Sequence, residues 1–142
     1  MNIKKLWIIN ILISIILLSS IQVVGNQNNE TTLEIINIRG GFGRVTADIE
    51  NTGSVTAENF FITISVKGGL LNNIDILQEC GGCGDCGTTI AVGQIKSEST
   101  LESGSIMGFG LIDIIVTAEA DNADKVTRET NGFVIGPLVL IF

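Results

Sequence analysis

The chain has 142 residues, with 15 acidic and 8 basic side chains, a net charge of −7, and neither histidine nor tyrosine. An acidic chain lacks the lysine and arginine footprint that binds nucleic acid or anionic membrane surfaces, so neither is an expected partner. Without histidine, the usual catalytic triads, histidine general bases and histidine metal sites are excluded, and we expect a protein that is not an enzyme and holds no cofactor.

The first 25 residues have the layout of a secretory signal peptide. Lys4 and Lys5 precede an apolar run over residues 6–18, and small residues follow at Val23-x-Gly25. This order predicts export, with cleavage after Gly25 and a final location outside the cell or at its surface. The alternative is an uncleaved N-terminal anchor, because residues 6–24 nearly reach the roughly 20 apolar residues that a membrane helix needs.

A polar lead-in over residues 26–32 separates the leader from one domain over residues 33–142. Asn29 opens the sequon Asn29-Glu30-Thr31 and is a candidate glycosylation site. Cleavage after Gly25 removes 2 of the 8 basic residues and none of the 15 acidic ones, so 6 minus 15 leaves a net charge of −9. The exported domain is therefore expected to be strongly acidic.

From Leu33 onward the apolar residues recur with a period of two, which is typical of β-strands. Strands are expected at 45–50 and 60–66, separated by the turn residues Asn51-Thr52-Gly53-Ser54. The side chains expected to face the core are Val45, Ala47, Ile49, Phe60, Ile62, Ile64 and Val66. Further strands are expected at 70–77, 88–95, 105–109, 111–120 and 126–142. Seven or eight short strands predict an all-β, antiparallel sandwich of the immunoglobulin type, preceded by a signal helix.

Several turn and strand-end motifs carry a resemblance to a known family. Residues 44–66, RVTADIENTGSVTAENFFITISV, form a strand that ends at an Asn-x-Gly turn and is followed by a second strand. The other motifs are Gly40-Gly41-Phe42-Gly43, Gly108-Phe109-Gly110 and the GFVIGP segment 132–137. The hairpin resembles the opening of cell-adhesion-related β-sandwich domains (CARDB type), and the wider frame is similar to small exported archaeal proteins with an immunoglobulin-like sandwich and no assigned activity. The resemblance implies a fold and no active site, and the chain departs from the CARDB pattern after Val66.

Three cysteines, Cys80, Cys83 and Cys86, lie in one glycine-rich loop. In an exported protein the spacing favours an intramolecular disulfide with one thiol left over, and of the three open pairings Cys80–Cys86 closes the widest loop. The alternatives are an intermolecular crosslink through the odd thiol, a metal site and fully reduced thiols. A fourth metal ligand would have to be Asp85 or Glu79, which is tolerable for Zn²⁺ and poor for an iron–sulfur cluster.

Two pairs of acidic residues are close together in the sequence. Asp48 and Glu50 are two residues apart on one strand, and we expect a solvated strand face there. Asp121 and Asp124 lie in the segment Asp121-Asn122-Ala123-Asp124, which predicts a hairpin turn, with a weak calcium site as the minority interpretation.

The C-terminal segment 133–142, FVIGPLVLIF, is apolar at nearly every position and too short to span a bilayer. We expect one strand that is buried on both faces and kinked or bulged at Gly136-Pro137. The alternative is an interaction strand that pairs with a neighbouring subunit or docks on a membrane-proximal partner. The residues of that candidate strand are Leu138, Val139, Leu140, Ile141 and Phe142.

These features together predict an exported structural or adhesive cell-surface module without catalytic activity. The expected partners are other envelope or surface proteins, including further copies through an edge strand, and the membrane only through an uncleaved N-terminal segment. The alternative function is a small extracellular redox or metal-binding protein that acts through the cysteine loop. A carbohydrate- or calcium-binding module is a third hypothesis, which rests on acidity and fold analogy alone.

Overall fold

The computed structural model describes residues 30–81 and 89–142. The predicted signal peptide, Asn29 of the sequon, and the loop residues Cys83 and Cys86 lie outside these ranges. In the described ranges, neither short helix has the length or the apolar character to cross a membrane. The described part of the chain is almost entirely β-strand, which confirms the expected all-β class.

The described strands pair antiparallel and are joined by turns and two short 3₁₀ helices. In chain order the elements are β1 (Leu33–Gly40), β2 (Val45–Asn51), β3 (Ala57–Glu58), β4 (Phe61–Gly68), η1 (Leu70–Asn72), β5 (Ile74–Gly81), β6 (Thr89–Ile90), β7 (Ile95–Ser99), η2 (Thr100–Glu102), β8 (Gly108–Ala120), β9 (Ala123–Gly136) and β10 (Leu138–Ile141).

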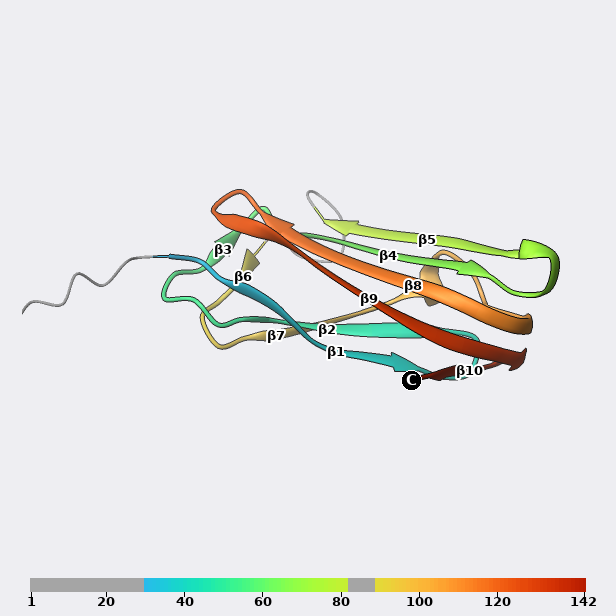
Figure 1. The fold of residues 1–142 in the computed structure, drawn as a ribbon. Coiled ribbons are helices and arrows are strands. Elements are labelled where there is room, and N and C mark those ends of the chain that lie inside the picture. Colours follow the sequence, from blue (N-terminus) through green and yellow to red (C-terminus); the bar gives the residue numbers. More distant parts are fainter. Residues whose placement is uncertain (1–29, 82–88) are drawn as a thin grey trace, which may run out of the picture.

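Two sheets lie in separate layers and face one another (Figure 1). The larger has the strand order β10-β9-β8-β4-β5, and the smaller has the order β1-β2-β7. The short strands β3 and β6 form a third, two-stranded sheet. The described ranges thus hold ten strands, more than the seven or eight expected, because β3 and β6 are only two residues long and the C-terminal segment divides in two.

The core lies between the two layers and follows the period of two. All seven side chains predicted to face it are 0–1 % exposed. The larger sheet adds a row of β-branched side chains from its central and edge strands, namely Ile112, Ile114, Val116, Val134 and Val139. β-Branched residues favour this pleated, closely packed environment, so the sequence pattern and the packing agree.

The strand expected at 70–77 begins later than predicted. Residues 70–72 form η1, and β5 starts at Ile74. Leu71 and Asn72 have φ values of 62° and 55°, and a left-handed backbone cannot continue a strand. The strand expected at 88–95 is also interrupted, because Gly93 adopts a φ of 71° in the turn between β6 and β7.

The strands expected at 105–109 and 111–120 are one long strand, β8, which starts at Gly108. Gly110 does not end it, although its φ of 124° is one that glycine adopts far more readily than other residues. A Cβ at this position would lie 2.9 Å from the backbone nitrogen of Leu70, so the glycine lets η1 pack closely beside β8.

The expected kink at Gly136-Pro137 is a complete reversal of the chain. β9 ends at Gly136, β10 begins at Leu138, and Leu138 pairs with Ile135 across the turn. Gly136 has a φ of 59°, which a tight hairpin turn requires and which glycine adopts at little cost. The prediction of a single strand over 126–142 was therefore wrong.

The two sheets meet at one corner, where the end of β1 lies beside β10 (Figure 1). The backbone N–H of Val139 donates to the carbonyl of Gly41 at 2.9 Å, and that of Gly43 donates to the carbonyl of Pro137 at 2.6 Å. A Cβ on Gly40 would lie 2.2 Å from the carbonyl oxygen of Val139, so only glycine fits there. The glycine-rich motif at 40–43 is thus a junction between the layers.

Candidate interaction surface

Apolar side chains gather on the outer face of the larger sheet, where β8, β9 and β10 lie side by side. Cross-strand pairing places Phe109, Ile135 and Leu138 in one row and Leu111, Phe133 and Leu140 in the next. Phe142 follows β10, and its backbone N–H donates to the carbonyl of Asn131 at 3.2 Å. We call this set the apolar face: Phe109, Leu111, Phe133, Ile135, Leu138, Leu140 and Phe142.

Most side chains of the apolar face are open to solvent. The exposed fractions are 57 % for Phe109, 65 % for Leu111, 49 % for Ile135, 44 % for Leu138, 45 % for Leu140 and 73 % for Phe142. Phe133 is partly buried and meets Phe109 edge to face, with ring centroids 5.2 Å apart and an interplanar angle of 86°. This contact orders two aromatic rings at the centre of the exposed surface.

The intervening residues Val134 and Val139 point inward and are 0 % and 2 % exposed. The expectation that 133–142 would be buried on both faces was therefore wrong, because this sheet is an outer layer of the sandwich and no described element covers its outer side. In the candidate interaction strand, Leu138, Leu140 and Phe142 are exposed, whereas Val139 and Ile141 pack towards the core.

Polar side chains border the apolar face along the strands. The side chain of Asn131 donates to Asp113 Oδ1 at 2.6 Å, and the next outward row pairs Ile115 with Glu129. Further along, the hydroxyls of Thr117 and Thr127 lie 3.3 Å apart. The apolar side chains thus occupy one end of a long sheet rather than its whole surface.

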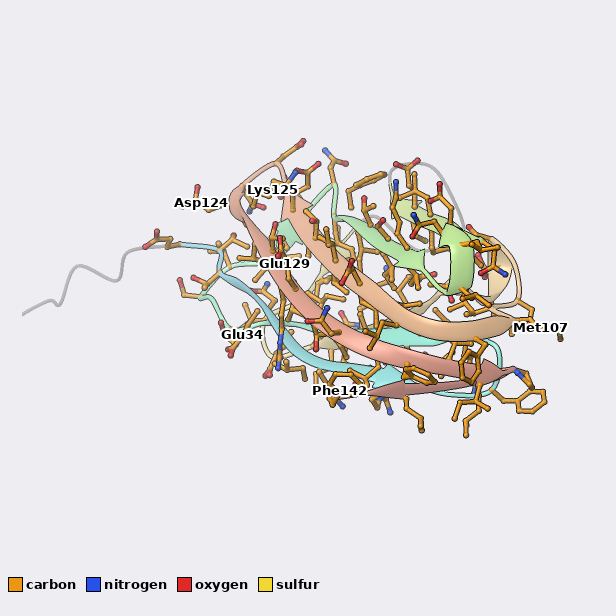
Figure 2. The ribbon with its side chains drawn as sticks, turned by 45° about the vertical axis from the view of Figure 1, so that its right-hand side comes forward. Glu34, Met107, Asp124, Lys125, Glu129 and Phe142 are labelled. Carbon is orange, nitrogen blue, oxygen red and sulfur yellow. The ribbon has the colours of Figure 1, made fainter. Side chains whose placement is uncertain are left out.

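Other large apolar side chains are exposed at the same end of the sandwich. Phe42 forms a β-bridge with Leu138, and η1 lies beside β8, where the N–H of Gly69 donates to the carbonyl of Leu111 at 2.7 Å. Figure 2 shows Met107 at this end and Asp124 and Lys125 at the opposite end of the molecule. The apolar face therefore lies at the end of the sandwich opposite to Asp124 and Lys125.

β8 and β9 form a hairpin, as predicted, with Asp121 in its two-residue turn and Asp124 at the start of β9. Asp121 accepts a hydrogen bond from the side chain of Asn59, and the side chain of Asn122 bonds to the backbone of Glu58 and Thr56. Within residues 30–81 and 89–142, no cluster of three or more His, Cys, Asp or Glu side chains is arranged to hold a metal ion. Calcium binding at Asp121 and Asp124 remains a prediction.

Asp48 does not lie on a solvated strand face and is only 8 % exposed. It accepts hydrogen bonds from Arg39 at 2.7 Å and from Ser97 at 2.6 Å. β2 is the central strand of the smaller sheet, so side chains from β1 and β7 cover it on both sides. The expectation for Asp48 was wrong, and its role is a structural link across three strands.

A second polar cluster closes the edge between β5 and β7. Gln78 is 3 % exposed, donates to Glu98 at 3.4 Å and accepts from Ser103 at 2.5 Å. Burial raises the pKa of the Glu98 carboxyl, and the neighbouring Glu102 carboxylate adds to the rise. The cluster satisfies a buried amide and has no nucleophile beside an activating base, so it does not suggest catalysis.

Cys80, near the end of β5, is 4 % exposed and faces the core. It takes part in a disulfide, and its predicted partners Cys83 and Cys86 lie outside the described residues. The choice between the pairings Cys80–Cys83 and Cys80–Cys86 therefore remains a prediction.

No family model matches the chain, and no curated protein matches it. The resemblance to CARDB-type domains remains a prediction.

Proposed function

We propose that this protein is an exported structural or adhesive module of the cell surface, with an immunoglobulin-like sandwich that resembles CARDB-type domains. It binds other envelope or surface proteins through the apolar face and catalyses no reaction. The observation that carries the proposal is the apolar face itself, two adjoining rows of large apolar side chains on the outside of a sheet.

The size of the apolar face supports a binding role. A large apolar side chain has a solvent-accessible area of about 150–250 Å² when it is fully exposed. Roughly half of that area remains accessible to solvent at most of the seven positions, so the apolar face has an accessible area on the order of 700 Å². The largest apolar patch on an ordinary monomer is about 300–600 Å². Removing this surface from water gives a favourable free energy of association.

The arrangement of side chains also resembles a protein interface. The centre of the face holds two aromatic rings and aliphatic neighbours without a charged group, and Asp113, Asn131 and Glu129 border it. Interfaces typically have such an apolar centre, depleted in charge, and a polar rim. A polar substrate pocket is not needed to explain these residues.

Site-specific photo-crosslinking in the producing cells tests this proposal. A photoreactive residue at Leu111 should give a crosslinked protein product in the cell envelope or medium. The matched control is Leu77 on β5, which is 52 % exposed on the same sheet but separated from the apolar face by β4. Absence of any product at Leu111, or retention of the protein in the cytosol, would contradict the proposal.

We also infer that the disulfide of Cys80 is a structural link rather than a redox or metal centre. Burial of Cys80 on the inner side of β5 supports this, because a reactive redox cysteine needs an accessible sulfur. Intact mass before and after reduction and alkylation should show one disulfide and no bound metal. Stoichiometric metal that disappears when all three cysteines are replaced by serine would support the alternative function instead.

A further inference from the structure

Resting on the proposed function, we propose that the partner bound by the apolar face is a second copy of the same chain. Two copies would pack face to face, with the apolar face of each covering that of the other. Such a contact is isologous, since both copies use the same residues and a twofold axis passes through the middle of the interface.

The geometry of the surface fits a second sheet better than a peptide or a small molecule. The apolar face lies on three neighbouring strands, and its residues form cross-strand rows. Exposed sheet faces are commonly buried by another sheet, with strands within about 30° of parallel and side chains interdigitating. In a face-to-face pair, Phe109 and Leu111 of one copy would meet apolar side chains of the same set in the other.

The area is sufficient for a stable dimer. Two faces of on the order of 700 Å² each would bury about 1,400 Å² in total, and specific interfaces bury about 1,200–2,000 Å². The T-shaped contact between Phe109 and Phe133 already orders the central rings, so less side-chain freedom is lost on association.

The distribution of charge permits self-association despite a net charge of −9 for the cleaved chain. No side chain of the apolar face is charged, and Asp121 and Asp124 lie at the opposite end of β8, in and beside the turn that leads into β9. The 13 residues of β8 span about 43 Å. The proposed twofold axis lies in the plane of the interface and crosses β8 at right angles, so the acidic turns of the two copies point in opposite directions and lie farther apart than the Debye length of about 8 Å.

The chain's own N-terminal residues do not reach the apolar face once the predicted signal peptide is removed. Thr31 forms a bridge with Ala123, which places the start of the domain at the acidic end. Residues 26–29 would extend at most about 14 Å from Glu30, against about 43 Å along β8. Residues 26–29 are therefore too short to cover the apolar face.

Sedimentation equilibrium of the exported protein, purified as its host releases it, tests the inference. We expect a concentration-dependent dimer that Leu111→Asp weakens by at least about 30-fold, the effect of a lost interface hot spot. Leu140→Asp on β10 is a second variant with the same expected effect. The matched control Leu77→Asp should leave the dissociation constant unchanged, and thermal unfolding of each variant reports whether it is folded.

A protein that stays monomeric up to about 1 mM overturns the inference. The photo-crosslinked product at Leu111 separates this failure from failure of the proposed function. A product with the mass of two copies supports the dimer. A product that contains a different protein overturns self-association and leaves the proposed function standing. If the protein is monomeric and gives no crosslinked product at Leu111, both the dimer and the proposed function are contradicted.

Discussion

The carbonyl oxygen of Val139 lies so close to Gly40 that a Cβ on this glycine would come within 2.2 Å of it. The two residues belong to different sheets, β10 in the larger and β1 in the smaller. Backbone hydrogen bonds from Val139 to Gly41 and from Gly43 to Pro137 hold the same corner. This junction positions β10, and with it the exposed side chains of Leu138 and Leu140.

Gly40→Ala is expected to destabilise the fold by about 1–3 kcal/mol, because the methyl group has no space and the corner must open. Urea unfolding followed by circular dichroism measures the change. The matched control is Gly41→Ala, where the nearest neighbouring atom would be Arg44 Cγ at 3.5 Å, an ordinary contact. Equal stability of the Gly40→Ala variant and the wild type would show that β1 and β10 do not pack as described.

Much of the core could be predicted from sequence because the central strands present one face to the interior. The alternation at Val45, Ala47 and Ile49 identified buried side chains correctly. The predicted strand boundaries were wrong where the backbone conformation, rather than the residue type, determines where a strand begins or ends. The left-handed φ of Leu71 is unusual for leucine, so a sequence of apolar residues at 70–77 looked like a strand.

Asn51→Asp should lower the free energy of unfolding by about 3 kcal/mol or more at neutral pH. Asn51 is 0 % exposed. Its Nδ2 donates to the carbonyl of Val55 at 2.8 Å and to that of Ile90 at 2.9 Å. Its Oδ1 accepts from the backbone N–H of Gly53 at 3.0 Å. Aspartate keeps the shape but directs a negative oxygen at two carbonyl oxygens. Denaturant titration should show a change in the free energy of unfolding within about 0.5 kcal/mol for the control Thr52→Ala. An equally large decrease in both variants would refute the hydrogen bonds assigned to Asn51.

Leu71→Gly should stabilise the isolated protein by about 1 kcal/mol. Leu71 is 92 % exposed with a φ of 62°, so glycine removes backbone strain at little loss of buried surface. Leu70→Gly is the control, because Leu70 is not among the residues with positive φ and glycine there adds only chain entropy. Differential scanning calorimetry should show a higher melting temperature for Leu71→Gly and a lower one for Leu70→Gly than for the wild type. A lower value for Leu71→Gly would mean that its side chain makes a stabilising contact.

The apolar face could be predicted only in part. The C-terminal residues Leu138, Leu140 and Phe142 were candidates, but Phe109 and Leu111 were not, because an apolar run on both faces is also typical of a fully buried strand. Which of the two applies depends on whether a further layer covers the sheet. That information lies in the order of the layers and is not contained in the local sequence.

Glu98→Gln is expected to make the protein more stable than the wild type at pH 7, with an advantage that disappears as the pH falls. Burial raises the pKa of the Glu98 carboxyl above its ordinary value of 4.5, so the folded state binds its proton more tightly than the unfolded state. The stabilisation that comes with this proton is complete below about pH 4.5 and is lost as the pH rises through the folded pKa. Glutamine cannot ionise and retains an oxygen that can accept from Gln78.

The free energy of unfolding, measured in urea between pH 4.5 and 7, should converge for the two proteins at the acidic limit. A Glu98→Gln difference that is constant with pH would rule out this account of the β5–β7 edge.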